Sequence, residues 1–289
     1  MKKKHLHTGK SHLRVFFGLL SDHKCGQLEV TMKLYIRFFS IHIRSVIQYK
    51  VSFLLTTLGQ FLVSFNVFLG IYFMFQRFHQ VKGYNYSEAL LCFSIVVMSF
   101  SIAELFLRGF DLFSATISNG EFDRILLRPR NEVFLVLAGK IEFTRVGRII
   151  QTIIILIYGI VTSKIVWSAD KILTMLLMII GGSVIFGCLF VIYAGICFFT
   201  LEGLEFMNIL TDGAKEFGKY PMNIYGKNVL KFCTYVIPYA LFQYYPFMYL
   251  IGRATNPVYI VLPIATCFFI IPTYMLWSRG VRHYQSTGS

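Results

Sequence analysis

The chain has 289 residues, of which 56% are hydrophobic and 15% are charged, and its mean hydropathy is +0.62. Soluble domains carry about 25% charged residues, so this composition excludes an ordinary soluble enzyme, a disordered chain and a fibre. It predicts an integral membrane protein of apolar helices. In such a protein, a net charge of +14 is typical of basic cytoplasmic loops and contact with anionic lipid, and we expect no nucleic-acid partner.

The N-terminal residues differ from the rest of the chain. Residues 1–31 are basic and polar, and we interpret them as a flexible tail or as an over-long start, with Met32 as the alternative first residue. Residues 33–50 are amphipathic, a pattern that predicts a helix lying in the headgroup plane. The remaining domain, 32–289, holds every long apolar run.

Six apolar runs are long enough to cross a membrane, which takes about 20 residues. The third is the weakest, because Lys164 falls within it and would have to reach the interface. In chain order, the predicted spans are Val51–Phe75, Ser87–Leu107, Ile149–Trp167, Ile172–Leu201, Phe232–Gly252 and Ala254–Ser278.

The loops between these runs predict the orientation. Ten Lys and Arg residues precede the first span, seven lie between the second and third, four lie between the fourth and fifth, and two follow the sixth. Only five lie toward the other side, including Lys164 near the end of the third span. By the positive-inside rule, both termini are cytoplasmic.

Enzymatic motifs are absent from the sequence. Gly9-Lys10-Ser11 resembles the end of a phosphate-binding loop, but position 4 is Lys where that loop needs Gly. No cysteine pair or histidine pair has metal-ligand spacing. We therefore expect no catalytic residue, no metal site and no bound cofactor, and energy for any work must come from a partner or an ion gradient.

A few polar residues fall within the predicted spans, where they are costly and therefore candidates for function. Glu104 stands four residues before Arg108, which suits an ion pair within one helix at the cytoplasmic boundary; a substrate site is the alternative. The neutral residues either bridge helices by hydrogen bonds or line a translocation path. They are Gln60, Asn66, Gln151 and Gln243.

The loop before the third span carries the densest pattern. Apolar residues recur at helical spacing, Asn119-Gly120 is a turn signal, and charges alternate up to Pro129. Such a segment either docks onto a soluble partner or is a solvated loop near the headgroups.

This loop also carries a family resemblance. The strings GEFDRILLRP (120–129) and KIEFTRVGR (140–148) are similar to those of permease subunits of ABC-2-type exporters. The resemblance covers about residue 32 to the C-terminus. Further matching blocks are 202–213, 216–221, 224–226, Ile237-Pro238 and Tyr244-Tyr245-Pro246.

The resemblance implies an all-α, six-span, type V-like exporter permease fold with an N-terminal interfacial helix, in a bacterial plasma (inner) membrane. It implies two copies of a cytoplasmic ATPase, which would hold ATP and Mg²⁺, and a second permease, with a heterodimer as the expected form. It also implies an outer re-entrant segment at Pro238, Tyr244, Tyr245 and Pro246. The implied ATPase-coupling residues are Glu121, Phe122, Asp123, Arg124, Arg128 and Pro129.

The function predicted from these observations is ATP-driven export, with the permease coupling a partner ATPase to a translocation path. Two other classes stay open. A gradient-driven transporter or channel would need an ion site in the membrane, for which Glu104 is the candidate. A membrane anchor or sensor would not move a substrate at all.

Overall fold

The computed structural model describes residues 25–200 and 208–286, and within these ranges the regular structure is helical, with no strand. The chain divides into two units, residues 1–48 and 49–289. The first unit contains helix α2, Cys25–Gln48. The predicted amphipathic stretch 33–50 therefore falls largely within a helix, which begins eight residues earlier; residues 1–24 lie outside the described part.

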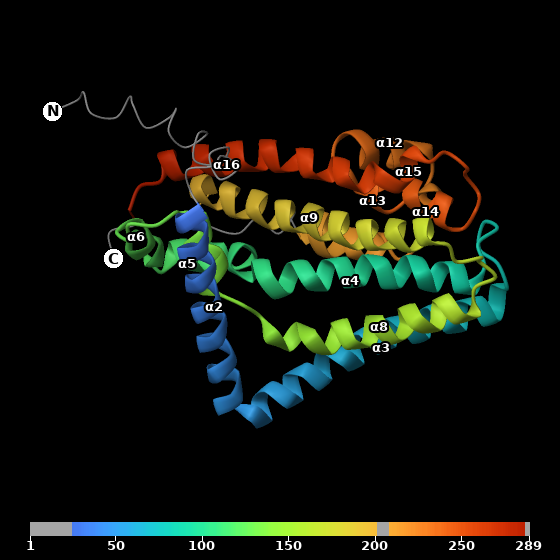
Figure 1. Ribbon diagram of the computed structural model, residues 1–289, viewed down its shortest axis with the longest axis horizontal. Coiled ribbons are helices and arrows are strands. Elements are labelled where there is room, and N and C mark those ends of the chain that lie inside the picture. The colour runs from blue at the N-terminus through green and yellow to red at the C-terminus, as the bar shows by residue number, and fades with distance from the viewer. Residues whose placement is uncertain (1–24, 201–207, 287–289) are drawn as a thin grey trace. The chain divides into compact units, whose positions relative to one another are not determined.

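The second unit is a bundle of long helices. In Figure 1 four of them, α4 (Tyr86–Asp111), α8 (Val146–Thr162), α9 (Ala169–Thr200) and α16 (Ile270–His283), run side by side. A fifth, α3 (Lys50–Phe78), packs along α8. Among the described residues, five helical segments are long and apolar enough to cross a membrane: Lys50–Phe78, Tyr86–Ser118, Phe143–Thr162, Ala169–Thr200 and Val258–His283.

Five of the six predicted spans thus correspond to helices. The third is shorter than expected, because α8 ends at Thr162. Lys164 therefore lies beyond the helix, and its side chain does not have to extend from within the helix to the interface. The last span is irregular, since α15 (Val258–Val261) continues into a 3₁₀ stretch, η6 (Leu262–Phe269), before α16. Pro263 at the start of η6 lacks a donor and favours this local change. Leu201, the predicted end of the fourth span, lies outside the described residues.

The predicted fifth span, Phe232–Gly252, is wrong as a single helix. This stretch falls into three short helices, α12 (Lys227–Tyr235), α13 (Tyr239–Phe242) and α14 (Tyr245–Leu250). Pro238 and Pro246 each stand at the start of one of them, where a missing N–H costs little, and neither fits a continuous helix interior. The three helices pack against α9 and the other segments of the bundle.

The segment 208–226 takes an unexpected course. It comprises a π-helical turn η4 (Ile209–Gly213), α11 (Ala214–Phe217) and a 3₁₀ turn η5 (Met222–Tyr225). The Gly218 carbonyl accepts a hydrogen bond from Cys92 Sγ at 3.4 Å, and the Asn223 side chain accepts one from Tyr84 Oη at 3.0 Å. The segment therefore runs along α4 toward its Tyr86 end and is not a loop beyond the bundle.

Small residues set the closest helix approach. A side chain at Gly147, in the first turn of α8, would collide with the backbone carbonyl of Thr57 in α3. Gly59, two residues beyond Thr57 in α3, has open space where a side chain would begin. The α3–α8 contact thus depends on the absence of a side chain at Gly147.

We expect Gly147→Ala to lower the thermal unfolding temperature of the purified protein in detergent. Overpacking of this kind costs about 1–3 kcal/mol, because backbone on both helices must shift. Gly59→Ala is the matched control and should be neutral or slightly stabilising, since Ala favours helix. Equal unfolding temperatures for the two variants would contradict this account of the α3–α8 contact.

Candidate functional site: a buried charge cluster and the α5–α7 segment

The most heavily paired ionic group among the described residues is Glu104, near the Asp111 end of α4. Its side chain is only 6% exposed and faces three arginines. Arg148 Nη1 donates to Glu104 Oε2 at 2.6 Å, Arg145 Nη2 lies 3.2 Å from Oε1, and Arg108 Nη1 lies 3.4 Å from Oε1. We call Glu104, Arg108, Arg145 and Arg148 the charge cluster.

The cluster joins three helices. Arg148 of α8 also donates from Nη2 to Gln60 Oε1 of α3 at 2.7 Å, so one guanidinium bridges α3 and α4. Arg108 additionally pairs with Asp111 one turn further on. The predicted Glu104–Arg108 pair within one helix is present, but it is the longest of the three contacts, and the arginines that follow the loop supply the closer ones.

The other predicted polar residues separate into different environments. Gln151 is 2% exposed, and neither atom of its amide has a hydrogen-bond partner in the described part of the chain. Asn66 lies on an exposed face of α3. Gln243 bridges segments: its Nε2 donates to the Tyr220 carbonyl at 2.8 Å and contacts Cys92 Sγ at 3.0 Å. Only Gln60 and Glu104 are brought together in one network.

The α5–α7 segment, residues 112–140, follows directly from α4. It consists of α5 (Phe113–Ser118), α6 (Glu121–Leu126) and α7 (Glu132–Gly139). The predicted Asn119-Gly120 turn is present: Gly120 has φ = +66°, a conformation that favours glycine, and it allows α6 to start at Glu121. Asn131 caps α7 by accepting a hydrogen bond from the Phe134 N–H at 3.2 Å.

Phe122 anchors this segment and is not a surface contact. Its ring is fully buried, with centroids 5.0 Å from Phe198, 5.0 Å from Tyr284 and 5.3 Å from Phe113. Trp277 of α16 packs on the same group. The expectation that Phe122 touches a partner is therefore corrected: the side chain fixes α6 against α9 and α16 by edge-to-face packing.

Polar contacts add to this anchor. Ser286 Oγ donates to Asp123 Oδ2 at 2.6 Å, which ties α6 to the chain beyond α16. Burial, together with the neighbouring Asp123 carboxylate, raises the pKa of the Tyr284 phenol above its ordinary value. On the other side of the segment, the Glu142 N–H donates to the Leu105 carbonyl of α4 at 3.1 Å.

The outward side of α6 combines basic and apolar groups. Arg124 and Arg128 are exposed, Pro129 is exposed, and Leu127 is 85% exposed, more than any other large apolar residue described. Leu127 is not among the residues predicted from the sequence, although its position between two arginines and before a proline could have indicated an exposed contact residue. Leu126 is exposed as well, so this side of α6 presents two leucines beside two cations.

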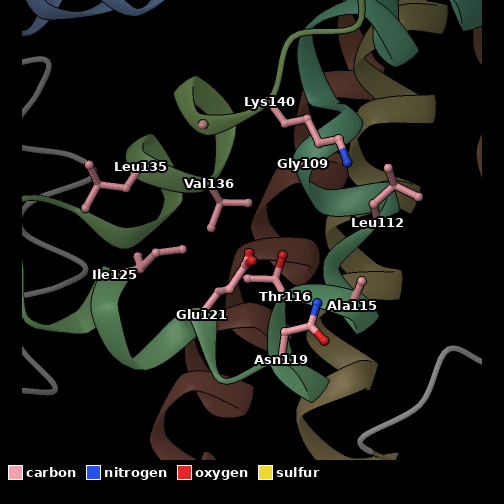
Figure 2. A pocket seen from close by; sticks show the side chains of 11 residues that line it. Gly109, Leu112, Ala115, Thr116, Asn119, Glu121, Ile125, Leu135, Val136 and Lys140 are labelled. Carbon is pink, nitrogen blue, oxygen red and sulfur yellow. The ribbon is translucent and has the colours of Figure 1, made fainter.

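A cavity lies between the α5–α7 segment and the end of α4. Its volume is about 260 Å³. Figure 2 shows the Glu121 carboxylate, Thr116 and Asn119 grouped on one side of it and the Lys140 side chain extending from the far side. Gly109 of α4 lies so close to the Val136 carbonyl of α7 that no side chain fits there. The segment is thus in direct contact with α4 at Gly109 and leaves a polar space beside that contact.

The predicted outer residues lie in α13 and α14 and their flanks. The rings of Tyr244 and Tyr245 meet edge to face at 5.2 Å, and Tyr245 Oη lies 3.4 Å from Thr234 Oγ1. Pro238 precedes α13, and Pro246 lies in the first turn of α14. Beyond α14, Arg253 donates to Glu88 at 2.9 Å, so this region is joined to the Tyr86 end of α4.

Glu104→Gln should destabilise the protein strongly, because it leaves buried guanidinium groups without a counter-charge. Breaking a buried ion pair from one side costs about 3–5 kcal/mol. Adding Arg148→Met should recover part of the loss, since the double variant removes the most buried of the guanidinium groups that lose their counter-charge. The measurement is thermal unfolding in detergent or nanodiscs; a single variant as stable as the parent would refute the structural role of the cluster.

Phe122→Ala should also lower stability, by about 3–5 kcal/mol, because it leaves a cavity among aromatic rings. Leu127→Ala, five residues away and exposed, should leave the unfolding temperature unchanged. The pair separates an anchoring residue from a surface residue in one thermal assay. If both variants unfold with the parent, Phe122 does not anchor the segment.

Comparison with known proteins places the chain in a family. The model of the ABC-2 family transporter protein matches residues 61–288, which includes the charge cluster, the α5–α7 segment and the last helices. No curated protein and no solved structure matches the sequence. The match covers more than half of the chain, and the matched region holds four of the five long apolar helices and most of α3. The chain is therefore a multi-pass membrane protein that belongs to the ABC-2 transporter family.

Proposed function

We propose that this protein is the permease subunit of an ATP-driven exporter and that the α5–α7 segment receives the movement of a partner ATPase. The observation that carries the proposal is the exposed surface of Arg124, Leu127 and Arg128 on a segment that is fixed to the bundle. Phe122 fixes it to α9 and α16, and Gly109 brings it against α4. A force applied to this surface reaches three long helices without passing through a mobile loop.

The charge cluster extends this connection to α8 and α3. The chain leaves α7 at Lys140 and reaches Arg145 and Arg148 within eight residues, and both side chains pair with Glu104. Displacement of the segment therefore changes the position of the groups that hold α3, α4 and α8 together. In this mechanism nucleotide binding favours one arrangement of the bundle over another, and that difference in affinity is the energy source.

ATP and Mg²⁺ belong to the partner in this proposal, because the sequence carries no complete nucleotide-binding motif. Two copies of a cytoplasmic ABC ATPase would bind one pair of permeases, and a heterodimer of permeases is the expected form. Docking of an ATPase at an exposed leucine flanked by arginines needs complementary acidic and apolar groups on the ATPase. Hydrolysis by this chain alone is not expected.

The orientation follows from the basic residues. With the Asp111 end of α4 in the cytoplasm, the nine basic residues before α3, Lys50 at its start and the seven from Arg108 to Arg148 lie on the inner side. The segment 208–226 then makes the sixth crossing in place of 232–252, and both termini remain cytoplasmic. Lys215 and Lys219 then lie within the crossing and Lys227 and Lys231 lie beyond it, so all four leave the inner-loop count, but the excess of basic residues on the inner side remains. The proposed location is a bacterial inner membrane.

A gradient-driven transporter is the weaker candidate. Its ion site would be Glu104, but three guanidinium groups surround that carboxylate, and their positive charge opposes the approach of a cation. A membrane anchor or sensor does not require an exposed α6 surface that is fixed to the bundle. Both alternatives predict no dependence on a partner ATPase.

The surface is tested by Arg124→Ala/Leu127→Ala/Arg128→Ala in the native cell. We expect at least a tenfold loss of the ATPase that co-purifies with the tagged permease, and a parallel loss of ATP-dependent transport in vesicles, because a central apolar contact and two charges are removed. The unfolding temperature should not change. The matched control is Lys227→Ala/Lys231→Ala, which removes two charges elsewhere. Full ATPase recovery by the triple variant would exclude this surface as the docking site.

A further inference from the structure

A second pocket lies at the other end of α4 from the α5–α7 segment. Its volume is about 520 Å³, within the range of ligand pockets, about 300–1,000 Å³. The start of α4, the end of α8, the connection from α8 to α9 and the first turn of α9 form its walls. In Figure 1 the chain turns from α8 to α9 at the same end of the bundle at which α4 begins.

The surrounding helices place this pocket at one membrane surface. The three segments that begin or end around it, Tyr86–Ser118, Phe143–Thr162 and Ala169–Thr200, are each long and apolar enough to cross a membrane. Such segments end where the hydrocarbon gives way to lipid headgroups. The pocket therefore lies at headgroup level, and in the orientation proposed above it faces the outer leaflet.

Two lysines line the pocket without a partner. Lys164 lies in the connection after α8, and Lys171 lies in the first turn of α9. Neither forms an ion pair or a side-chain hydrogen bond within residues 25–200 and 208–286. The hydroxyl of Ser87, in the first turn of α4, also lacks a hydrogen-bond partner in these ranges. The pocket thus offers two ammonium groups and one hydroxyl to a ligand.

The acidic groups beside the pocket are already bound. Glu88 lines it, but its carboxylate accepts from the Arg253 guanidinium at 2.9 Å and from a backbone N–H at 3.0 Å. Asp170 accepts from the Tyr249 hydroxyl of α14 at 2.5 Å. Glu88 and Arg253 cancel, so the two lysines outweigh the single charge of Asp170, and the starts of α4 and α9 add partial positive charge. The pocket is therefore positive on balance.

Apolar residues border the two cations. Ile165, Val166 and Ile251 belong to the lining, and Val166 is 81% exposed. Val161, near the end of α8, is 77% exposed. Exposed valines at the edge of the hydrocarbon are suited to acyl chains, whereas lysines there extend their ammonium groups to the headgroups. The site combines the two chemistries of an amphiphile with an anionic head.

We propose that this pocket binds the phosphate headgroup of an anionic phospholipid from the outer leaflet. Lys164 and Lys171 contact the phosphate oxygens, Ser87 donates a hydrogen bond, and an acyl chain lies along Val166 and Val161. Phosphatidylglycerol suits the site better than phosphatidylcholine, because the choline cation would be repelled by the lysines. A free phosphate shares the head chemistry but leaves the apolar border unused. The site goes beyond the proposed export function, and only the choice of leaflet rests on the proposed orientation.

The test measures lipid binding to the purified full-length protein in detergent by native mass spectrometry. Phosphatidylglycerol and phosphatidylcholine with the same acyl chains are titrated separately. We expect phosphatidylglycerol to bind roughly tenfold more tightly, because cations near the membrane surface attract anionic lipid. In Lys164→Gln/Lys171→Gln this preference should disappear, while binding of phosphatidylcholine stays as in the parent.

Two further variants serve as controls. Lys227→Gln/Lys231→Gln removes the same charge from residues that do not line the pocket, and it should bind phosphatidylglycerol like the parent. Lys164→Arg/Lys171→Arg keeps both positive charges and should retain the preference. Without added lipid, all three variants should unfold at the temperature of the parent, because the substituted side chains are not buried.

Three outcomes would overturn the inference. The first is equal affinity of the parent for the two lipids, and the second is an unchanged preference in Lys164→Gln/Lys171→Gln. The third is displacement of phosphatidylglycerol by inorganic phosphate at the same concentration, which would make a water-soluble phosphate compound the ligand. Recovery of an ATPase does not enter these measurements, so failure of the lipid site leaves the exporter assignment standing.

Discussion

The single carboxylate of Glu104 holds together much of this bundle. A buried negative charge is stable only with its counter-charges in place, and here those come from α4, from the short turn before α8 and from α8 itself. Arg148 then extends the network to Gln60 of α3. The positions of three helices at the Asp111 end of the bundle thus depend on one ionic group and on hydrogen bonds whose geometry tolerates little displacement.

The α5–α7 segment is supported from two sides, and the supports differ physically. Aromatic packing around Phe122 fixes α6 to α9 and α16, while backbone contact at Gly109 and the return to Arg145 connect the segment to α4 and the charge cluster. Apolar packing opposes separation in any direction, whereas the strength of the ionic contacts depends on small changes in distance and charge. The segment therefore combines an apolar anchor to α9 and α16 with a connection to the ionic group that holds α3, α4 and α8.

The second consequence of the fold concerns the charges of the segment 208–226. Because this segment runs along α4, four charged residues that the sequence alone places in an aqueous loop lie beside a long apolar helix. The structure reduces their cost by pairing each acid with a lysine and by directing the lysines toward the bundle, one of them over the Phe100 ring.

Sequence determined the class of the protein, five of the long helices, the turn at Asn119-Gly120 and the pattern of charged and apolar residues in the loop before α8. These features depend on local properties, namely long apolar runs, glycine conformation and the alternation of charge. Periodicity could not show that Phe122 is an anchor and Leu127 a surface residue, since both are apolar residues in the same short segment and only packing against α9 and α16 distinguishes them.

Likewise, hydropathy favoured 232–252 over 208–226 as a crossing, because it counts each charge as exposed. In the tertiary structure Asp212, Lys215, Glu216 and Lys219 pair with one another, and Glu104 pairs with arginines 41 and 44 residues away in the chain. Local composition does not show pairing between residues that are far apart in the chain.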